Sequence, residues 1–72
     1  MRTVDATGLL CPLPVLRAQK ALREMASGEI VEVLATDTAS VHEFPAFCEQ
    51  SGHVLLESEE TDGRFRFRLR KA

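Results

Sequence analysis

The most constraining feature of the sequence is the alternating segment near its carboxyl end, Arg64 to Arg70. If this segment is extended, two phenylalanines and a leucine lie on one side and four arginines on the other. Asp62-Gly63, a strong signal for a two-residue turn, joins it to a second strand-like segment, Val54 to Glu60. The pattern predicts a hairpin in a sheet that buries one face and exposes the other to water.

The rest of the chain alternates between strand-like and helix-like segments. We expect a first strand over Arg2 to Ala6, a first helix over Pro12 to Ala26, a central strand over Ile30 to Leu34 and a second helix over Thr38 to Ser51. The order βαβαββ predicts an α/β (α+β) two-layer sandwich, with two helices packed on one face of a four-stranded mixed sheet. No linker or repeat divides the chain, so a single domain over residues 1–72 is expected.

Apolar residues recur at helical spacing in both predicted helices, which indicates the face that each helix buries. The stripe of the first helix is Val15, Ala18, Leu22 and Met25, broadened by Leu16, and that of the second is Val41, Phe44, Phe47 and Cys48. Thr36-Asp37-Thr38 offers an N-cap for the second helix, which Pro45 should kink.

Composition limits the classes of protein to which the chain can belong. A net charge of −2 gives no overall attraction to nucleic acid or to an acidic membrane surface. No apolar run is long enough to span a bilayer, and the amino terminus lacks the pattern of a secretory signal. Two cysteines are too few for a disulfide scaffold, so a soluble protein of the reducing cytoplasm is expected.

The sequence Cys11-Pro12-Leu13-Pro14 stands where the first strand gives way to the first helix. Because Pro is favoured at the first position of a helix, Pro12 predicts that Cys11 is the N-cap. The sulfur would then face the positive end of the helix dipole, which favours the thiolate. Leu13 is expected to be exposed beside the thiol. Pro14 occupies the place of the second cysteine of a Cys-x-x-Cys oxidoreductase, which disfavours a dithiol cycle and favours covalent carriage by one thiol.

The other titratable residues offer weaker alternatives. Cys48 is expected in the core, although the sequence leaves a disulfide to Cys11 open. His42 and His53 could in principle join the two cysteines in a zinc site, but no pair has the short spacing of structural zinc motifs, so no metal is expected.

Two groups of basic residues could bind partners. In the predicted hairpin register Arg66 lies opposite Glu59 and Arg68 opposite Glu57, which neutralises the arginine stripe and disfavours direct binding of nucleic acid. Arg17 and Lys20 lie one and two turns into the first helix, where a solvated face and a docking site for an acidic partner are both open interpretations.

The motifs together resemble the TusA/SirA-like family of small sulfur-carrier proteins over nearly the whole chain. The matching elements are Asp5-x-x-Gly8-x-x-Cys11-Pro12-x-Pro14, Lys20, Ala35-Thr36-Asp37, Phe44-Pro45-x-Phe47-Cys48, Gly52-His53, Glu60-Thr61-Asp62-Gly63 and Arg70-Lys71. The resemblance implies that Cys11 carries sulfane sulfur as a persulfide, supported by Pro12, Leu13 and Pro14. It requires no cofactor beyond the covalently held sulfur.

The resemblance also implies the classes of partner. A cysteine desulfurase or a rhodanese-type enzyme would supply the sulfur, and a DsrE-type or other relay protein would accept it for tRNA thiolation, cofactor biosynthesis or sulfur oxidation. Docking would use Leu13, Arg17 and Lys20, with Arg2 as a further candidate. Such a carrier works with partner enzymes rather than as a self-sufficient catalyst.

Three residues depart from the pattern common in the family. Leu13 replaces the acidic residue of tRNA-thiolation members, His42 stands where Arg is frequent, and Glu43 stands where Asp is frequent. Leu13 leaves the recipient pathway open. The choice between sulfur and selenium and the oligomeric state are also open. A regulatory adaptor without sulfur transfer and, less favoured, a small RNA-binding domain are the alternative functions.

Overall fold

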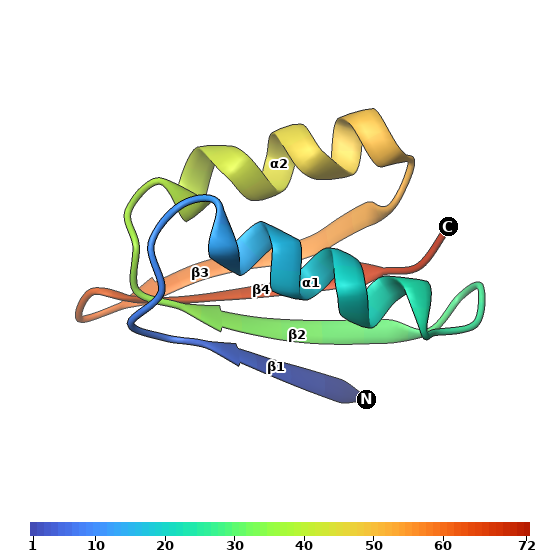
Figure 1. Ribbon diagram of the computed structural model, residues 1–72, viewed down its shortest axis with the longest axis horizontal. Coiled ribbons are helices and arrows are strands. Elements are labelled where there is room, and N and C mark those ends of the chain that lie inside the picture. The colour runs from blue at the N-terminus through green and yellow to red at the C-terminus, as the bar shows by residue number, and fades with distance from the viewer.

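The computed structural model describes residues 1–72, which form one four-stranded sheet with two helices on one of its faces (Figure 1). The elements are β1 (Arg2–Ala6), α1 (Leu13–Arg23), β2 (Ile30–Ala35), α2 (Ser40–Ser51), β3 (Val54–Thr61) and β4 (Arg64–Arg70). The strand order is β1-β2-β4-β3, with β1 parallel to β2 and the other pairs antiparallel. The predicted two-layer architecture is confirmed.

The hairpin follows the sequence signal closely. Asp62 and Gly63 both adopt positive φ angles, 51° and 79°, as a two-residue turn matched to the twist of the strands requires. The register pairs Glu59 with Arg66 and Glu57 with Arg68, as predicted, before a bulge near the start of β3. β4 therefore directs its apolar residues to the helices and its arginines to the open face of the sheet.

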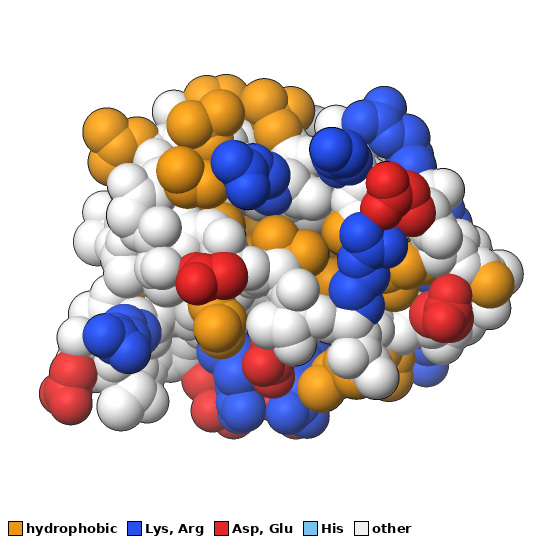
Figure 2. Space-filling view, turned by 60° about the horizontal axis from the view of Figure 1, so that its bottom comes forward, with side chains coloured by type: hydrophobic (Ala, Val, Ile, Leu, Met, Phe, Trp, Pro, Cys, Tyr) orange, Lys and Arg blue, Asp and Glu red, His pale blue; other side chains and the backbone are white.

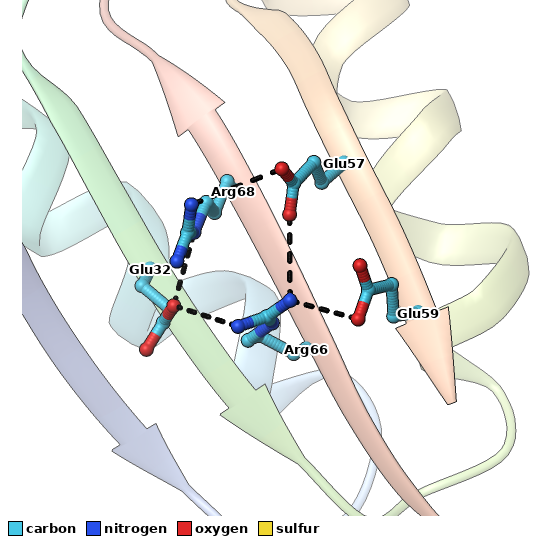
Figure 3. Close-up of polar contacts among 5 residues, drawn as sticks. All are labelled: Glu32, Glu57, Glu59, Arg66 and Arg68. Carbon is cyan, nitrogen blue, oxygen red and sulfur yellow. Dashed lines mark hydrogen bonds and ion pairs between the residues drawn. The ribbon is translucent and has the colours of Figure 1, made fainter. Parts of the chain in front are cut away.

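Two of the four arginines of β4, Arg66 and Arg68, are neutralised on that open face (Figure 3). Arg66 pairs with Glu59 at 2.7 Å, and Arg68 pairs with Glu32 of β2 at 3.1 Å. Glu57 lies between the two guanidinium groups, 3.5 Å from Arg66 and 3.8 Å from Arg68. The sequence predicted the two acidic partners on β3, whereas the contribution of Glu32 comes from the order of the strands.

The core lies between the sheet and the helices and contains Phe44 of α2 stacked on Phe67 of β4, with ring centroids 4.5 Å apart. Ala18, Ala21 and Leu22 of α1 complete the layer above β2. The predicted stripes were wrong at Leu16 and Val41, which are exposed, while the other predicted stripe residues are buried or half-buried. In α2 the buried positions follow a four-residue spacing, so Ser40 rather than Val41 precedes Phe44 and Cys48 in the core.

Both helices are shorter than predicted. α1 ends at Arg23 instead of Ala26 because the N–H groups of Glu24 and Met25 bond carbonyls three residues back, which tightens the last turn. α2 begins at Ser40 instead of Thr38 because the Ser40 N–H bonds the Asp37 carbonyl in a separate tight turn. α2 continues through Pro45 and ends at Gly52, which has the left-handed conformation of a helix C-cap. Neither helix has the length and apolar character needed to cross a membrane.

Candidate functional site

Cys11 lies on the loop between β1 and α1, at the end of the sheet where the parallel strands β1 and β2 both terminate (Figure 1). The loops that follow these strands therefore meet. The Gly8 N–H donates to the Thr36 hydroxyl at 2.8 Å, and the Cys11 N–H donates to Asp37 Oδ2 at 2.6 Å. Two residues directly after β2 thus fix the backbone that presents the thiol.

The loop places Cys11 before the helix rather than at its cap. A tight turn, closed by a 2.9 Å bond from the Leu13 N–H to the Leu10 carbonyl, has Cys11 and Pro12 at its corner, and the Cys11–Pro12 peptide is cis. Pro12 takes the N-cap position, and helical geometry begins only at Leu13. The prediction of Cys11 as the N-cap was therefore wrong, because the turn between Leu10 and Leu13 inserts one residue between the cysteine and the helix.

The thiol contacts a carboxylate instead of the helix dipole. Cys11 Sγ donates a hydrogen bond to Oε2 of Glu43, in the first turn of α2, at 2.6 Å. This bond, with smaller contributions from burial and from the charges of Glu43 and Asp37, raises the pKa of the Cys11 thiol above its ordinary value. The expectation of a favoured thiolate was wrong for the free protein, since a full negative charge in contact outweighs the partial positive charge of a helix end.

The surface beside the thiol on the α1 side is apolar and basic. Leu10 is 71% exposed, and Leu13 and Leu16 of α1 are each nearly half exposed. Arg17 and Lys20 follow on α1 and are exposed, and each lies four residues from one of these leucines, at neighbouring positions on the helix surface. Figure 2 shows apolar side chains gathered at the upper left, beside Lys and Arg side chains. We call Leu10, Leu13 and Leu16 the leucine patch.

The other site residues predicted from the sequence differ in their burial and in their distance from the thiol. Pro12 is exposed at the corner of the turn, whereas Pro14 is buried beneath the first turn of α1. Arg2 is not near the thiol, because it begins β1 at the opposite end of the sheet and pairs with Glu24 just after α1. Cys48 is buried in the core, as its helical position indicated, and burial raises its pKa. The disulfide to Cys11 that the sequence left open is not formed, since both thiols are free.

Neither histidine forms a hydrogen bond with Cys11. His42 is exposed on α2, and His53 lies just before β3, where its Nδ1 accepts the Ala72 N–H at 3.0 Å. Nowhere do three His, Cys, Asp or Glu side chains come together as ligands for a metal ion.

The thiol does not open into a pocket. One surface hollow lies over the hairpin end of the sheet and is lined by residues such as Thr7 and Arg64, and the other lies beside Arg2 and Met25. Neither includes Cys11. An exposed sulfur at the corner of a turn suits entry into the active site of another protein better than capture of a small molecule.

Sequence reasoning missed the roles of Asp37 and Glu43 at this site. A signal for Asp37 was present, because a polar residue just after a strand meets the loop after its parallel neighbour at the same edge of the sheet. Glu43 had no comparable signal, since only the packing of α2 against the rest of the fold brings it to Cys11.

Known proteins resemble this chain over nearly its full length. The family model described as sulfurtransferase TusA matches residues 2–71. A putative sulfur carrier protein of Neisseria meningitidis serogroup A is 57% identical over 63 residues, which cover 88% of this chain and 85% of the relative. The sulfur carrier protein TusA of Allochromatium vinosum is 51% identical over 69 residues, covering 96% of this chain and 91% of that protein.

A solved structure shows the same architecture. The crystal structure of a SirA-like protein from Desulfitobacterium hafniense superposes with a TM-score of 0.86 at 36% sequence identity, covering 97% of this chain and 96% of that one. With a family model that spans the fold and relatives of this similarity, the chain belongs to the TusA sulfurtransferase family.

Proposed function

We propose that this protein is a sulfur carrier that accepts sulfane sulfur as a persulfide on Cys11 and delivers it to a downstream protein. Its membership of the TusA family supports the carrier role. The observation that carries the assignment to Cys11 is the contrast between the two thiols, because Cys11 is exposed at a turn and Cys48 is buried in the core. Only an exposed thiol can meet the sulfur of a second protein without unfolding.

Loading is an exchange at one sulfur atom. Cys11 loses its proton to solvent, and the thiolate attacks the outer sulfur of a donor persulfide, R–S–SH, supplied by a cysteine desulfurase or a rhodanese-type enzyme. The donor S–S bond breaks as the new one forms. R–S⁻ leaves and takes up a proton, so the products are Cys11–S–SH and R–SH. No net electron is gained or lost, and no redox cofactor is needed.

Delivery repeats this exchange with the roles reversed. A cysteine thiolate of the acceptor, such as a DsrE-type relay protein, attacks the outer sulfur of Cys11–S–SH, and Cys11 leaves as the thiolate. Each step takes place in the active site of the partner, so this protein acts as a covalent carrier rather than a self-sufficient enzyme. The reducing cytoplasm is the proposed location, because the carrier requires a free thiol.

Docking would use the leucine patch together with Arg17 and Lys20. The exposed leucine side chains favour a partner with a complementary apolar surface. The two cations favour a partner whose surface around that apolar area is acidic. Arg17→Glu should slow loading roughly threefold to tenfold at low ionic strength and much less at high salt. Arg23→Glu, the same charge reversal at the far end of α1, is the matched control and should load normally.

The function is tested by incubating the protein with a cysteine desulfurase and free cysteine and recording its intact mass. Wild type and Cys48→Ala should gain one sulfur atom, which a reductant removes, and Cys11→Ser should gain none while keeping its fold. Sulfur retained by Cys11→Ser would contradict the assignment. Partner binding that is indifferent to Cys11→Ser, with no sulfur loaded by any variant, would favour the adaptor function.

A further inference from the structure

The side chain of Glu43 joins two parts of the fold at the thiol. Its Oε2 accepts the Cys11 hydrogen bond at 2.6 Å, while its Oε1 is enclosed and has no hydrogen-bond donor. Glu43 belongs to α2 and Cys11 to the loop before α1, so the contact depends on how the two loops at this end of the sheet are held together. The carboxylate therefore has one strong partner, the thiol.

The charges that face Cys11 are all negative. Glu43 approaches from α2 and Asp37 from the loop after β2, and Asp37 also accepts the Cys11 backbone N–H. On the helix that follows the thiol, Arg17 and Lys20 form no hydrogen bond with Cys11 and no ion pair with either carboxylate. No Lys or Arg side chain pairs with either carboxylate, and the two negative charges disfavour a third on the sulfur.

We infer that Glu43 is a positioning residue that holds unloaded Cys11 in its protonated, weakly nucleophilic form, and that a docked partner activates the thiol by placing a cation at Glu43 and Asp37. The thiol is thereby protected from adventitious electrophiles and oxidants while the carrier is free, since the thiolate is the reactive form. The activation step rests on the proposed sulfur-carrier function. The control of protonation is a property of the free protein and is tested without any sulfur donor.

The test compares Glu43→Gln with Glu49→Gln, a control on the exposed face of the same helix, in a Cys48→Ala background so that the thiol signal belongs to Cys11. Thiolate absorbance and the rate of alkylation by iodoacetamide are measured against pH. The thiolate fraction at pH 7 should rise about fivefold in Glu43→Gln, the factor that one unit charge centred about 4 Å away exerts in water-like surroundings. Alkylation should speed up roughly twofold to threefold, since a less basic thiolate is also less nucleophilic.

Glu43→Asp keeps the charge and should retain most of the wild-type pH profile. A profile of Glu43→Gln that coincides with that of Glu49→Gln would overturn the inference. A second measurement needs no variant at position 43: the Glu43 carboxyl carbon resonance should shift as Cys11 ionises, and the shift should vanish in Cys11→Ser. A resonance insensitive to Cys11 would also overturn the inference, whatever the outcome of the sulfur-loading test.

Discussion

Asp37 is the residue whose removal should most directly loosen the end of the molecule that presents the thiol. Its Oδ2 accepts the Cys11 N–H at 2.6 Å, and its Oδ1 accepts the Ala39 N–H at 3.1 Å. One half-buried carboxylate thus ties the loop before α1 to the turn that leads into α2. Both donors are backbone groups, so Asp37→Ala takes the acceptor away from two main-chain N–H groups at once.

The size of the effect follows from these two bonds. Each hydrogen bond to a charged acceptor at a half-exposed position contributes about 1 kcal/mol, toward the lower part of the range for such bonds. Asp37→Ala should therefore lower the free energy of unfolding by about 2 kcal/mol, which corresponds to a fall in Tm of roughly 8–16 °C in a domain of this size. Asp37→Asn keeps one carbonyl oxygen as an acceptor and should lose about 1 kcal/mol.

The assay is urea unfolding monitored by circular dichroism. The slope of the unfolding free energy against urea concentration should be the same in the variants as in the wild type. Thr38→Ala is the control, since the Thr38 side chain is exposed and forms no hydrogen bond in the structure. If Asp37→Ala were within about 0.5 kcal/mol of Thr38→Ala, the claim that Asp37 stabilises this end of the fold would be refuted.

Three further predictions concern the core, the hairpin and pH. Phe44→Ala removes a wholly buried ring stacked on Phe67 and should cost about 3–5 kcal/mol in urea unfolding, and a loss below about 1 kcal/mol would contradict this packing. Gly63→Ala forces a side chain to adopt a φ of 79° and should cost about 1 kcal/mol, so an unchanged Tm would refute the turn geometry. Burial lowers the pKa of His53, so the unfolded chain binds the proton more tightly than the folded protein does. The His53 contribution to the free energy of unfolding should therefore be complete above about pH 6.5 and fall as the pH drops below it, and His53→Gln should lose less stability over this range. An equal dependence of the unfolding free energy on pH in the two proteins would contradict this.

The hairpin was predictable from the sequence because its determinants are local. The turn residues Asp62-Gly63 fix the register, and the alternation in β4 fixes which face is buried, so the two arginine–glutamate pairs across the strands followed directly. The pairing of Glu32 with Arg68 could not be predicted from local sequence, since it depends on β2 being the neighbour of β4.

The position of Cys11 on an exposed loop before a helix was also predictable, but its chemical environment was not. Helix-capping rules describe a helix in isolation, and they predicted a stabilised thiolate. The dominant neighbour, Glu43, lies 32 residues away in the sequence and arrives only through tertiary packing. Leu16 and Val41 show the same limit, because a small two-layer fold buries a narrower stripe of each helix than apolar periodicity alone indicates.

A single-turnover relay experiment tests whether sulfur both arrives at and leaves from Cys11. Loaded carrier, freed of donor and excess cysteine, is mixed with a DsrE-type acceptor, and the intact masses of both proteins are followed with time. We expect the carrier to lose one sulfur atom at the same rate as the acceptor gains it, and mutation of the acceptor cysteine to stop both changes. Sulfur that stays on the carrier with every acceptor offered, or that leaves equally fast when the acceptor cysteine is absent, would contradict this expectation.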